Sequence, residues 1–482
     1  MKLRCRVPEV LSEDECERIL QAALRVWARV PLRAQGTPDF YDALAALGCR
    51  IEGERVWFTQ AARDAVLARI GAARGPVAAG EPDFPSTLTY GPSGQALWCH
   101  DPYTDKLRPA TEQDLADFSR VVDALGLPRY HPTFIPQDVP AASADVHAFA
   151  TILLNAARPH RVSVYSESSL PYFIELQAVV DGSVEKVRQA PVFAAKVWYN
   201  SPFMITGENI RLGMRARELL GQPLQISTMP VAGVATPATL AGALVQITAE
   251  VLGCNAVTLA VDDRLCGYCA GPLTFDMKMG IHTQTGPDVQ LLRLGAAQMG
   301  AYIFGGRYTA VGGPTTAAKT PGVQAMMEKS LDTTWAVLGG VRDFGSMAVL
   351  AFADIGSTVQ LMLDLEMMQH FDRLLRGSEV SEETLAEEVI AEVAPRGAYY
   401  LQEPHTAAHY REELFISELM DRRVAAAWMQ EPRTMLDNAR AKAVRLLESA
   451  PNLCPLSDEQ RAEVLRLVAA ADSEAEQTRR VR

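Results

Sequence analysis

Two of the eight cysteines stand in a single C-x-x-C motif, Cys266-Gly267-Tyr268-Cys269. Such a motif supplies either half of a zinc site or a redox-active dithiol. A structural zinc ion needs a second pair of ligands, and the sequence contains no other C-x-x-C. A thioredoxin-like dithiol would open a helix, whereas this motif follows a strand-like run at residues 257–261. We therefore interpret Cys266 and Cys269 as reduced cysteines in a loop.

Two histidines, His405 and His409, are spaced one helical turn apart and could bind a metal ion together. The zinc-protease pattern H-E-x-x-H requires a glutamate after the first histidine, and Thr406 occupies that position. We therefore favour a structural role, in which one imidazole bonds a helix end or a loop, over a metal site.

The segment from Pro230 to Glu250 joins a loop rich in Gly, Pro and Thr to a long Ala-rich helix. Small residues at the catalytic face of a parallel barrel let a large planar group approach the backbone closely. A tight turn that needs Gly and Pro for its shape explains the same composition equally well.

Helix and strand patterns alternate along the segments that would position these residues, and this alternation indicates a parallel sheet covered by helices. Capping boxes at Ser12/Glu15, Thr111/Asp114 and Ser457/Gln460 predict three helix starts. Ala-rich helical runs are predicted at residues 239–252 and 289–299. Strands are predicted near residues 130–136, 161–165, 194–199, 224–229, 256–261, 308–312, 335–338 and 397–401.

This alternation predicts an α/β fold, a (β/α)₈ TIM barrel with an N-terminal helical and extended cap and C-terminal helices. We expect the cap at residues 1–110, the barrel at 111–430 and the helical extension at 431–482. A doubly wound open sheet is the alternative; it usually has a glycine-rich first turn, and the sequence contains neither G-x-G-x-x-G nor a P-loop.

Composition narrows the possible partners. The formal charge is −12, which disfavours nucleic acid and anionic lipid, and no run of Lys and Arg opposes this locally. No uninterrupted apolar run approaches the roughly 18 residues of a membrane span, and the first ten residues lack the apolar core of a signal peptide. We therefore expect a cytoplasmic protein.

Several segments, taken in order, resemble the trimethylamine methyltransferase (MttB-like) superfamily. The run Thr236 to Gly242, followed by Ala249-Glu250, resembles the family's P-x-T-L-A-G … A-E signature. Its other matching segments are Ser201-Pro202, Phe275 to Gly280, Thr316 to Lys319 with Gln324 and Glu328, Asp364 to Glu366, and Leu401 to Arg411 with Asp421-Arg422 and Trp428.

The trimethylamine enzymes carry pyrrolysine near the block that Thr316 to Lys319 matches, and this chain has only standard residues there. The resemblance therefore implies the non-pyrrolysine branch, which demethylates quaternary amines such as glycine betaine. It also implies a corrinoid (cobalamin) carried by a cognate corrinoid protein, with no cofactor bound tightly to this chain and no metal ligands. We also expect the chain to form a homo-oligomer.

A quaternary ammonium leaves as a neutral amine, so methyl transfer to Co(I) needs orientation and exclusion of water rather than an acid. Aromatic faces bind such a cation, and a betaine carboxylate needs a cationic anchor. The residues expected at the substrate are the aromatics Tyr165, Trp198, Tyr199, Tyr268, Phe275, Tyr308 and Phe352 and the candidate anchors Arg264, Arg307 and His405. Those expected to face the corrinoid are Gly233, Thr236, Pro237, Asp276, Thr316 and Lys319.

Two alternatives remain open. One is zinc-activated methyl transfer using Cys266, Cys269 and a histidine such as His405. The other is a barrel protein that docks a corrinoid protein without turnover, an idea suggested by Ala317 and Asp288, where the family usually has other residues.

Overall fold

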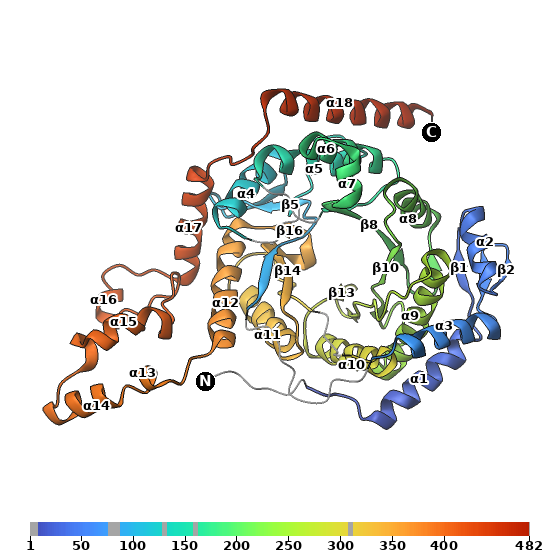
Figure 1. Ribbon diagram of the computed structural model, residues 1–482. Helices are drawn as coiled ribbons and strands as arrows, with labels where there is room; N and C mark the ends of the chain where they lie inside the picture. The colour runs from blue at the N-terminus through green and yellow to red at the C-terminus, as the bar shows by residue number, and fades with distance from the viewer. Residues whose placement is uncertain (1–7, 76–86, 128–132, 158–161, 307–311, 482) are drawn as a thin grey trace.

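The computed structural model describes residues 8–75, 87–127, 133–157, 162–306 and 312–481. Figure 1 shows the helices from α4 (Glu112–Ala124) to α12 (Thr358–Arg376) arranged in a ring, with short strands on their inner side. The chain is therefore a mixed α/β protein, as its alternating pattern predicts.

The N-terminal part packs helices against the outside of this ring. The capping box of the first helix is confirmed, since Ser12 and Glu15 bond each other's backbone amides. The elements here are α1 (Glu13–Trp27), β1 (Leu32–Ala34), α2 (Pro38–Ala46), β2 (Arg50–Glu52), β3 (Arg55–Trp57) and α3 (Gln60–Ala73).

The ring itself begins with three strands, β4 (Thr89–Pro92), β5 (Trp98–His100) and β6 (Leu107–Pro109). After α4, its first half contains α5 (Ala144–Asn155), β7 (Val162–Val164), α6 (Leu170–Asp181), α7 (Val184–Gln189), β8 (Phe193–Tyr199), β9 (Met204–Ile205), α8 (Gly207–Leu220), β10 (Gln225–Thr228) and β11 (Val231–Ala232). Its second half contains α9 (Leu240–Asp262), β12 (Leu273–Asp276), β13 (Ile281–Thr283), α10 (Pro287–Phe304), α11 (Val323–Leu338), β14 (Asp343–Met347), β15 (Val349–Leu350), η1 (Ala351–Ala353) and β16 (Ile355–Gly356), followed by α12.

Strand pairs inside the ring are mainly parallel. β7, β8 and β10 form one parallel sheet, and β12 runs parallel to β11. Strand β4 pairs with β14 and β5 with β16, so residues 89–100 share sheets with residues 343–356. Within the described residues the strands form five separate small sheets, and their hydrogen bonds do not join into one closed sheet.

Three predicted strands are wrong. Residues 256–261 are the last turns of α9, residues 335–338 end α11, and residues 397–401 form irregular and 3₁₀ structure. The first error has a clear cause: α9 is buried on nearly all sides, so its sequence lacks the polar face that marks a helix. The predicted strand at 308–312 lies almost entirely outside the described residues, as does the start of the one at 130–136.

Helix α9 is also long and apolar enough, by length and composition, to cross a membrane. However, 78% of its most apolar window is buried inside the protein. Helix α9 packs against α1, α2, α3 and α10. This burial is what the central helix of a protein core shows.

The C-terminal residues leave the ring after α12. They form α13 (Glu382–Leu385), α14 (Glu387–Val393), η2 (Ala394–Arg396), η3 (Tyr400–Gln402), α15 (Pro404–Glu413), α16 (Ala425–Trp428), α17 (Met435–Ser449) and α18 (Asp458–Val481). Helices α17 and α18 return to cover the ring, and α13 to α16 lie away from it (Figure 1).

A fully buried ion pair joins α11 to α12. Lys329 Nζ lies 2.7 Å from Asp364 Oδ2, and both side chains have no exposed surface. The same carboxylate accepts the backbone N–H of Ala348 and the side-chain amide of Gln360. Lys329 also donates to the carbonyl of Ser346. Charges out of contact with water are tolerated when they are paired and hydrogen-bonded in this way, and removal of one partner leaves the other unsatisfied.

The residues held by this pair have an unusual backbone. Ser346, Ala348, Ala351, Phe352 and Ala353 all have positive φ, between 47° and 86°, although none is glycine. Each such residue costs on the order of 1 kcal/mol or more and persists only where its surroundings enforce it. Besides the ion pair, the amides of Ala351 and Phe352 donate to the carbonyls of Ala318 and Thr316. Strain of this kind clusters at functional sites.

We predict that Lys329→Met lowers the free energy of unfolding by about 3–5 kcal/mol, because Asp364 is left charged and buried. The double variant Lys329→Met/Asp364→Leu should lose less than the sum of the two single changes, which a double-mutant cycle by urea denaturation measures. Lys186→Met, at an exposed position, is the control and should leave the midpoint unchanged. Strictly additive single effects would contradict a coupled pair.

Candidate functional site

A cavity of about 720 Å³ lies between the β12–β13 hairpin, the start of α10 and one face of α11. Its wall combines carboxylates, aromatic rings and apolar chains. The lining residues are Asp276, Met279, Ile281, Thr283, Thr285, Gly286, Pro287, Gln290, Ala317, Lys319, Gln324, Met327, Glu328, Leu331, Asp332, Trp335 and Phe352.

Helix α11 supplies one side of this cavity. Its lining residues are spaced four positions apart, so they lie on one face of the helix. Met327, Leu331 and Trp335 form an apolar ridge, and all three are at least 42% exposed. Glu328 and Asp332 follow the same spacing beside that ridge. Two acidic side chains four residues apart repel each other on a helix. Their placement on the cavity wall therefore has to be compensated by hydrogen bonds or by a cation.

Glu328 binds the loop that precedes α11. One of its carboxylate oxygens accepts Thr316 Oγ1 at 2.6 Å and the backbone N–H of Ala317 at 2.7 Å. The other oxygen accepts the side-chain amide of Gln324. Glu328 thus fixes the Thr316–Lys319 segment at the cavity edge.

Asp332 is almost completely buried at the cavity wall, with 1% of its surface exposed. It accepts hydrogen bonds from Gln290 Nε2 at 2.8 Å and Thr315 Oγ1 at 2.9 Å. Burial raises the pKa of Asp332 to about 6, although the nearby charge of Arg293 and these hydrogen bonds oppose the rise. This carboxyl therefore changes charge in the physiological pH range.

Phe352 enters the cavity from the strained segment. Its φ is 57°, and its backbone N–H donates to Thr316 at 2.9 Å. Its ring lies 5.5 Å from the ring of His282 on β13. The strained backbone therefore directs an aromatic ring toward the acidic wall of α11.

The structure brings together three of the predicted site residues. Asp276, Lys319 and Phe352 line this cavity, and Thr316 lies directly behind it, bonded to Glu328. Lys319 Nζ donates to the carbonyl of Ala317 and is exposed. It is the one cationic side chain among the described lining residues.

The remaining aromatic candidates lie elsewhere. Tyr199 is 1% exposed and packs in the core against Gly253 of α9, and burial raises its pKa. Tyr268 packs against Gly300 and shares a hydrogen bond with Thr248. Three further candidates, Tyr165 after β7, Trp198 on β8 and Phe275 on β12, are not lining residues of this cavity.

The candidate carboxylate anchors are also dispersed. Arg264 donates to the carbonyl of Leu224 beyond the end of α9. His405 bonds the carbonyl of Glu383, and His409 lies 3.3 Å from the same residue's carboxylate. Arg307 and Tyr308 lie outside the described residues.

The Gly233–Pro237 loop forms its own network next to the cavity hairpin. A side chain at Gly233, where φ is 95°, would meet Met277 and Phe275. Thr236 and Pro237 close the turn, with the Thr236 carbonyl accepting the Gly233 amide. Behind the loop, Glu250 is fully buried and accepts Ser201 Oγ at 2.5 Å and Gln246 Nε2 at 2.9 Å. Burial raises the pKa of Glu250.

The three ligands of the zinc alternative do not come together. Cys266 and Cys269 follow α9, with their sulfur atoms 3.6 Å apart, while His405 lies on α15 on the opposite side of the ring (Figure 1). Over the part of the chain that the structure describes, no group of three or more potential ligands is arranged to hold a metal ion.

Several cavity residues were not predicted as site residues from the sequence, among them Gln290, Asp332 and Trp335. The unfavourable spacing of Glu328 and Asp332 on one helix was a usable signal. No such signal marks Gln290 in the sequence, because its contact with Asp332 depends on how α10 packs against α11.

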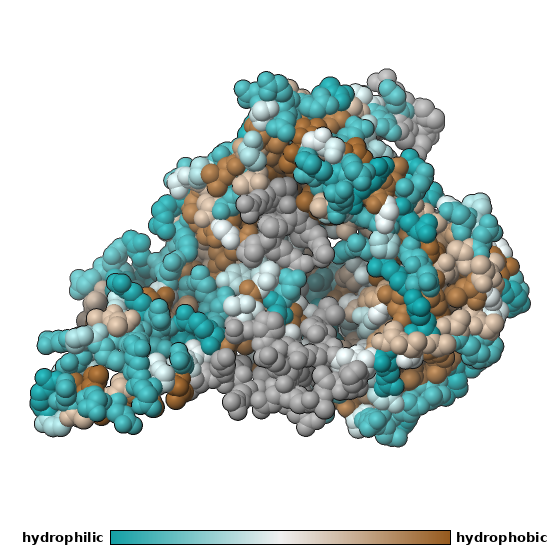
Figure 2. All heavy atoms as spheres, in the orientation of Figure 1, coloured by the Kyte–Doolittle hydropathy of each residue, from teal (hydrophilic) through white to brown (hydrophobic). Residues whose placement is uncertain are grey.

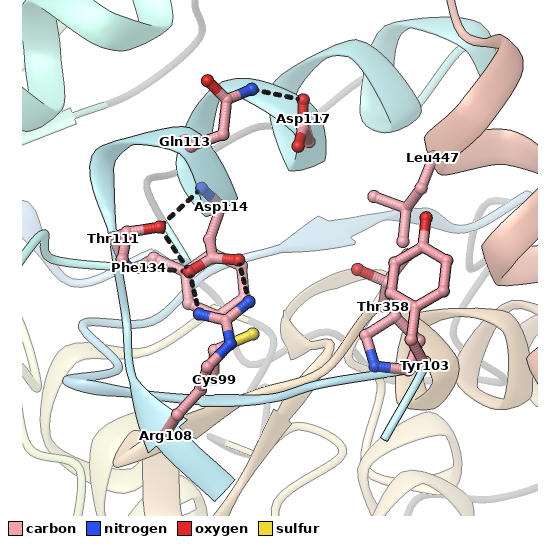
Figure 3. Close-up of a pocket in the computed structure, with 11 residues that line it drawn as sticks. Cys99, Tyr103, Arg108, Thr111, Gln113, Asp114, Asp117, Phe134, Thr358 and Leu447 are labelled. Atoms are coloured by element: carbon pink, nitrogen blue, oxygen red, sulfur yellow. Dashed lines mark hydrogen bonds and ion pairs between the residues drawn. The ribbon is translucent and has the colours of Figure 1, made fainter. Parts of the chain in front are cut away.

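A second cavity, of about 350 Å³, lies between the β5–β6 hairpin, α4 and α17 (Figure 3). Its strongest charges already satisfy each other, since Arg108 makes two hydrogen bonds to Asp114, at 2.6 and 2.7 Å. Asp114 also completes the capping box with Thr111, as predicted for α4. These charges hold the hairpin to the helix. They are therefore less available to bind a ligand than the charged groups of the α10–α11 cavity.

Comparison with known proteins shows which family the chain belongs to. The family model described as trimethylamine methyltransferase (MTTB) matches residues 2–474. The chain belongs to this family. It is a methyltransferase. Of the segments that resemble the family, Phe275 to Gly280, Thr316 to Lys319, and Gln324 with Glu328 contribute lining residues to the α10–α11 cavity.

Similar curated proteins include trimethylamine methyltransferase MttB of Desulfitobacterium hafniense, 27% identical over 74% of this chain and 71% of that protein. A glycine betaine methyltransferase of the same species is 23% identical over 91% of this chain and 92% of its own length. Trimethylamine methyltransferase MttB1 of Methanosarcina mazei is 28% identical over 66% of this chain and 64% of its own length.

We predict that Asp332 makes stability depend on pH. Its folded pKa, about 6, is above the ordinary value of 3.8, so the folded state favours the protonated form and loses stability as pH rises through this range. The melting temperature of Asp332→Asn relative to the parent should therefore increase between pH 4 and pH 7.5. Asp42→Asn, at an exposed position of α2, should show no such trend. An equal difference at both pH values for Asp332→Asn would contradict the assignment.

Proposed function

We propose that this chain transfers a methyl group from a small quaternary amine to the Co(I) corrinoid of a partner protein. Membership of the methyltransferase family, with relatives named for trimethylamine and glycine betaine, supports a methylated amine as the donor. The observation that supports a quaternary amine is the α10–α11 cavity, which places aromatic rings and carboxylates around one space.

The cavity suits a cation that cannot donate a hydrogen bond. The ring faces of Phe352 and Trp335 attract such a cation by about 0.5–2 kcal/mol each. Glu328 and Asp332 add negative charge at the same wall. Because their oxygens already accept hydrogen bonds from the protein, they attract the ligand by charge rather than by a directed bond.

The transfer requires positioning and exclusion of water. A quaternary nitrogen leaves as a neutral tertiary amine, so this chain needs no acid to protonate it. Met279, Met327 and Leu331 provide apolar surface around the methyl groups. Methyl transfer from neutral trimethylamine would instead expel a dimethylamide anion unless the nitrogen were first activated.

Lys319 supports a betaine over a simple quaternary amine. Its ammonium group lies on the edge of a cavity whose other charged groups are carboxylates. A carboxylate on the substrate would therefore be held at Lys319 while its ammonium group lies near Phe352 and the α11 wall. Lys319 takes the anchoring role that the sequence analysis considered for Arg264, Arg307 and His405.

The partner's corrinoid would approach beside the exposed apolar ridge of α11. Val323, Met327 and Leu331 are each more than half exposed and lie next to the cavity. This surface fits a large, flat, partly apolar group better than a small polar one. When bound, the corrinoid supplies the nucleophile that accepts the methyl group. We further propose that the ring of helices and strands is a (β/α)₈ barrel.

We predict that the protein methylates Co(I) cobalamin from a quaternary amine and not from trimethylamine. Absorbance of methylcobalamin, followed with glycine betaine, choline, tetramethylammonium and trimethylamine at matched concentration, measures this. Phe352→Leu should lower the rate with every quaternary amine, because one cation–π contact is lost. Faster methylation from trimethylamine would refute the proposal, and no methylation from any amine would favour docking without turnover.

We predict that Lys319→Met raises the KM for glycine betaine about 5-fold to 10-fold, because the carboxylate loses a charged partner. The KM for tetramethylammonium, which has no carboxylate, should stay unchanged. Equal effects on both substrates would show that Lys319 does not read the carboxylate.

A further inference from the structure

Residues 379–433 form an arm that extends away from the ring of helices. Figure 1 shows α13 to α16 outside the ring, and Figure 2 shows the same region projecting at the lower left. Only two of its side chains, Val393 and Leu419, are fully buried. A segment of this length cannot be stabilised by a core of two residues.

The base of the arm is nevertheless held firmly to the body. Arg373 on α12 donates to the carbonyl of Glu413, and Asn438 on α17 donates to that of Leu419. The rings of His370 and Phe415 lie 4.2 Å apart. These contacts fix where the arm leaves the body, so its surface is presented in a defined direction.

The larger part of the arm, residues 396–433, exposes nine large apolar side chains. Their exposed fractions range from 38% to 87%, for Tyr399, Tyr400, Leu401, Leu414, Ile416, Met420, Val424, Trp428 and Met429. Together they amount to on the order of 1,000 Å² of apolar surface. A stable dimer buries roughly 800 Å² on each partner, so these side chains expose enough area for one interface.

The charges of this part of the arm indicate what covers it. Residues 396–433 contain six acidic residues and five arginines, whereas residues 379–392 contain six glutamates and no Lys or Arg. Several charges in 396–433 are already paired within the arm, including Arg396 with Glu403 and Arg433 with Glu431. A balanced, internally paired surface can face a copy of itself without net repulsion. A strongly charged partner would instead need a surface of opposite sign.

We propose that residues 396–433 form the interface of a homodimer, in which the arms of two copies of this chain pack against each other. The interface is isologous, because the same apolar side chains and balanced charges face one another across a two-fold axis. The acidic segment at residues 379–392 stays outside this interface, exposed to water. This inference does not depend on the methyl-transfer reaction.

Light scattering after size-exclusion chromatography of the full chain tests this proposal. The parent should have about twice the chain mass of 52.5 kDa at about 20 µM. The variant Leu401→Asp/Val424→Asp should have half that mass, since both positions are at least 74% exposed and lie in the proposed interface. Leu453→Asp/Leu465→Asp, at exposed apolar positions outside the arm, is the matched control and should remain dimeric.

Unchanged circular dichroism of the arm variant shows that the loss of mass is not a loss of fold. A monomeric parent, or an arm variant that stays dimeric, overturns the proposal. A parent that is monomeric alone, but whose arm variant fails to transfer methyl groups to a corrinoid protein while still methylating free cobalamin, also overturns it and assigns the arm to that partner instead.

Discussion

The buried ion pair between Lys329 and Asp364 is the constraint on which the α10–α11 cavity depends. Both charged side chains are shielded from water, so each must be stabilised by the other and by hydrogen bonds from neighbouring polar groups. They do so by holding the carbonyl of Ser346 and the amide of Ala348, on both sides of a backbone that would otherwise relax. The strained residues that follow bring Phe352 to the cavity and join it to the Thr316–Lys319 segment. One pair of charges thereby connects α11, α12 and both loops of the site.

The chemistry of the site follows from this arrangement. Helix α11 contributes the two carboxylates, the strained segment contributes an aromatic ring, and Lys319 contributes a cation at the edge. A zwitterion with a bulky, fully methylated ammonium group matches these features in charge and in lack of hydrogen-bond donors. The chain belongs to a methyltransferase family, and three of the segments that resemble this family contribute residues to the same cavity.

Local signals in the sequence predict local structure well. The capping boxes that begin α1 and α4 are present as expected, since they involve residues three positions apart. The end of α9 was predicted as a strand because complete burial removes the helical period. At the site, Asp276 and Lys319 were predicted through their family segments, whereas Asp332 and Gln290 meet only through the packing of two helices. Tyr199 and Tyr268 were predicted at the substrate but do not line the cavity. The type of a residue does not determine whether its ring faces a core or a cavity.

Hydrogen exchange of the protein with and without saturating glycine betaine tests the central claim most directly. The amides of Ala317, Ala351 and Phe352 are hydrogen-bonded within the two loops that meet at the cavity. If the substrate binds between these loops and α11, exchange should slow in peptides that cover residues 315–319 and 346–353. Peptides that cover α5 and α6, on the other side of the ring, should exchange as before. Protection confined to other parts of the ring, with no change in these two loops, would contradict this account of the site.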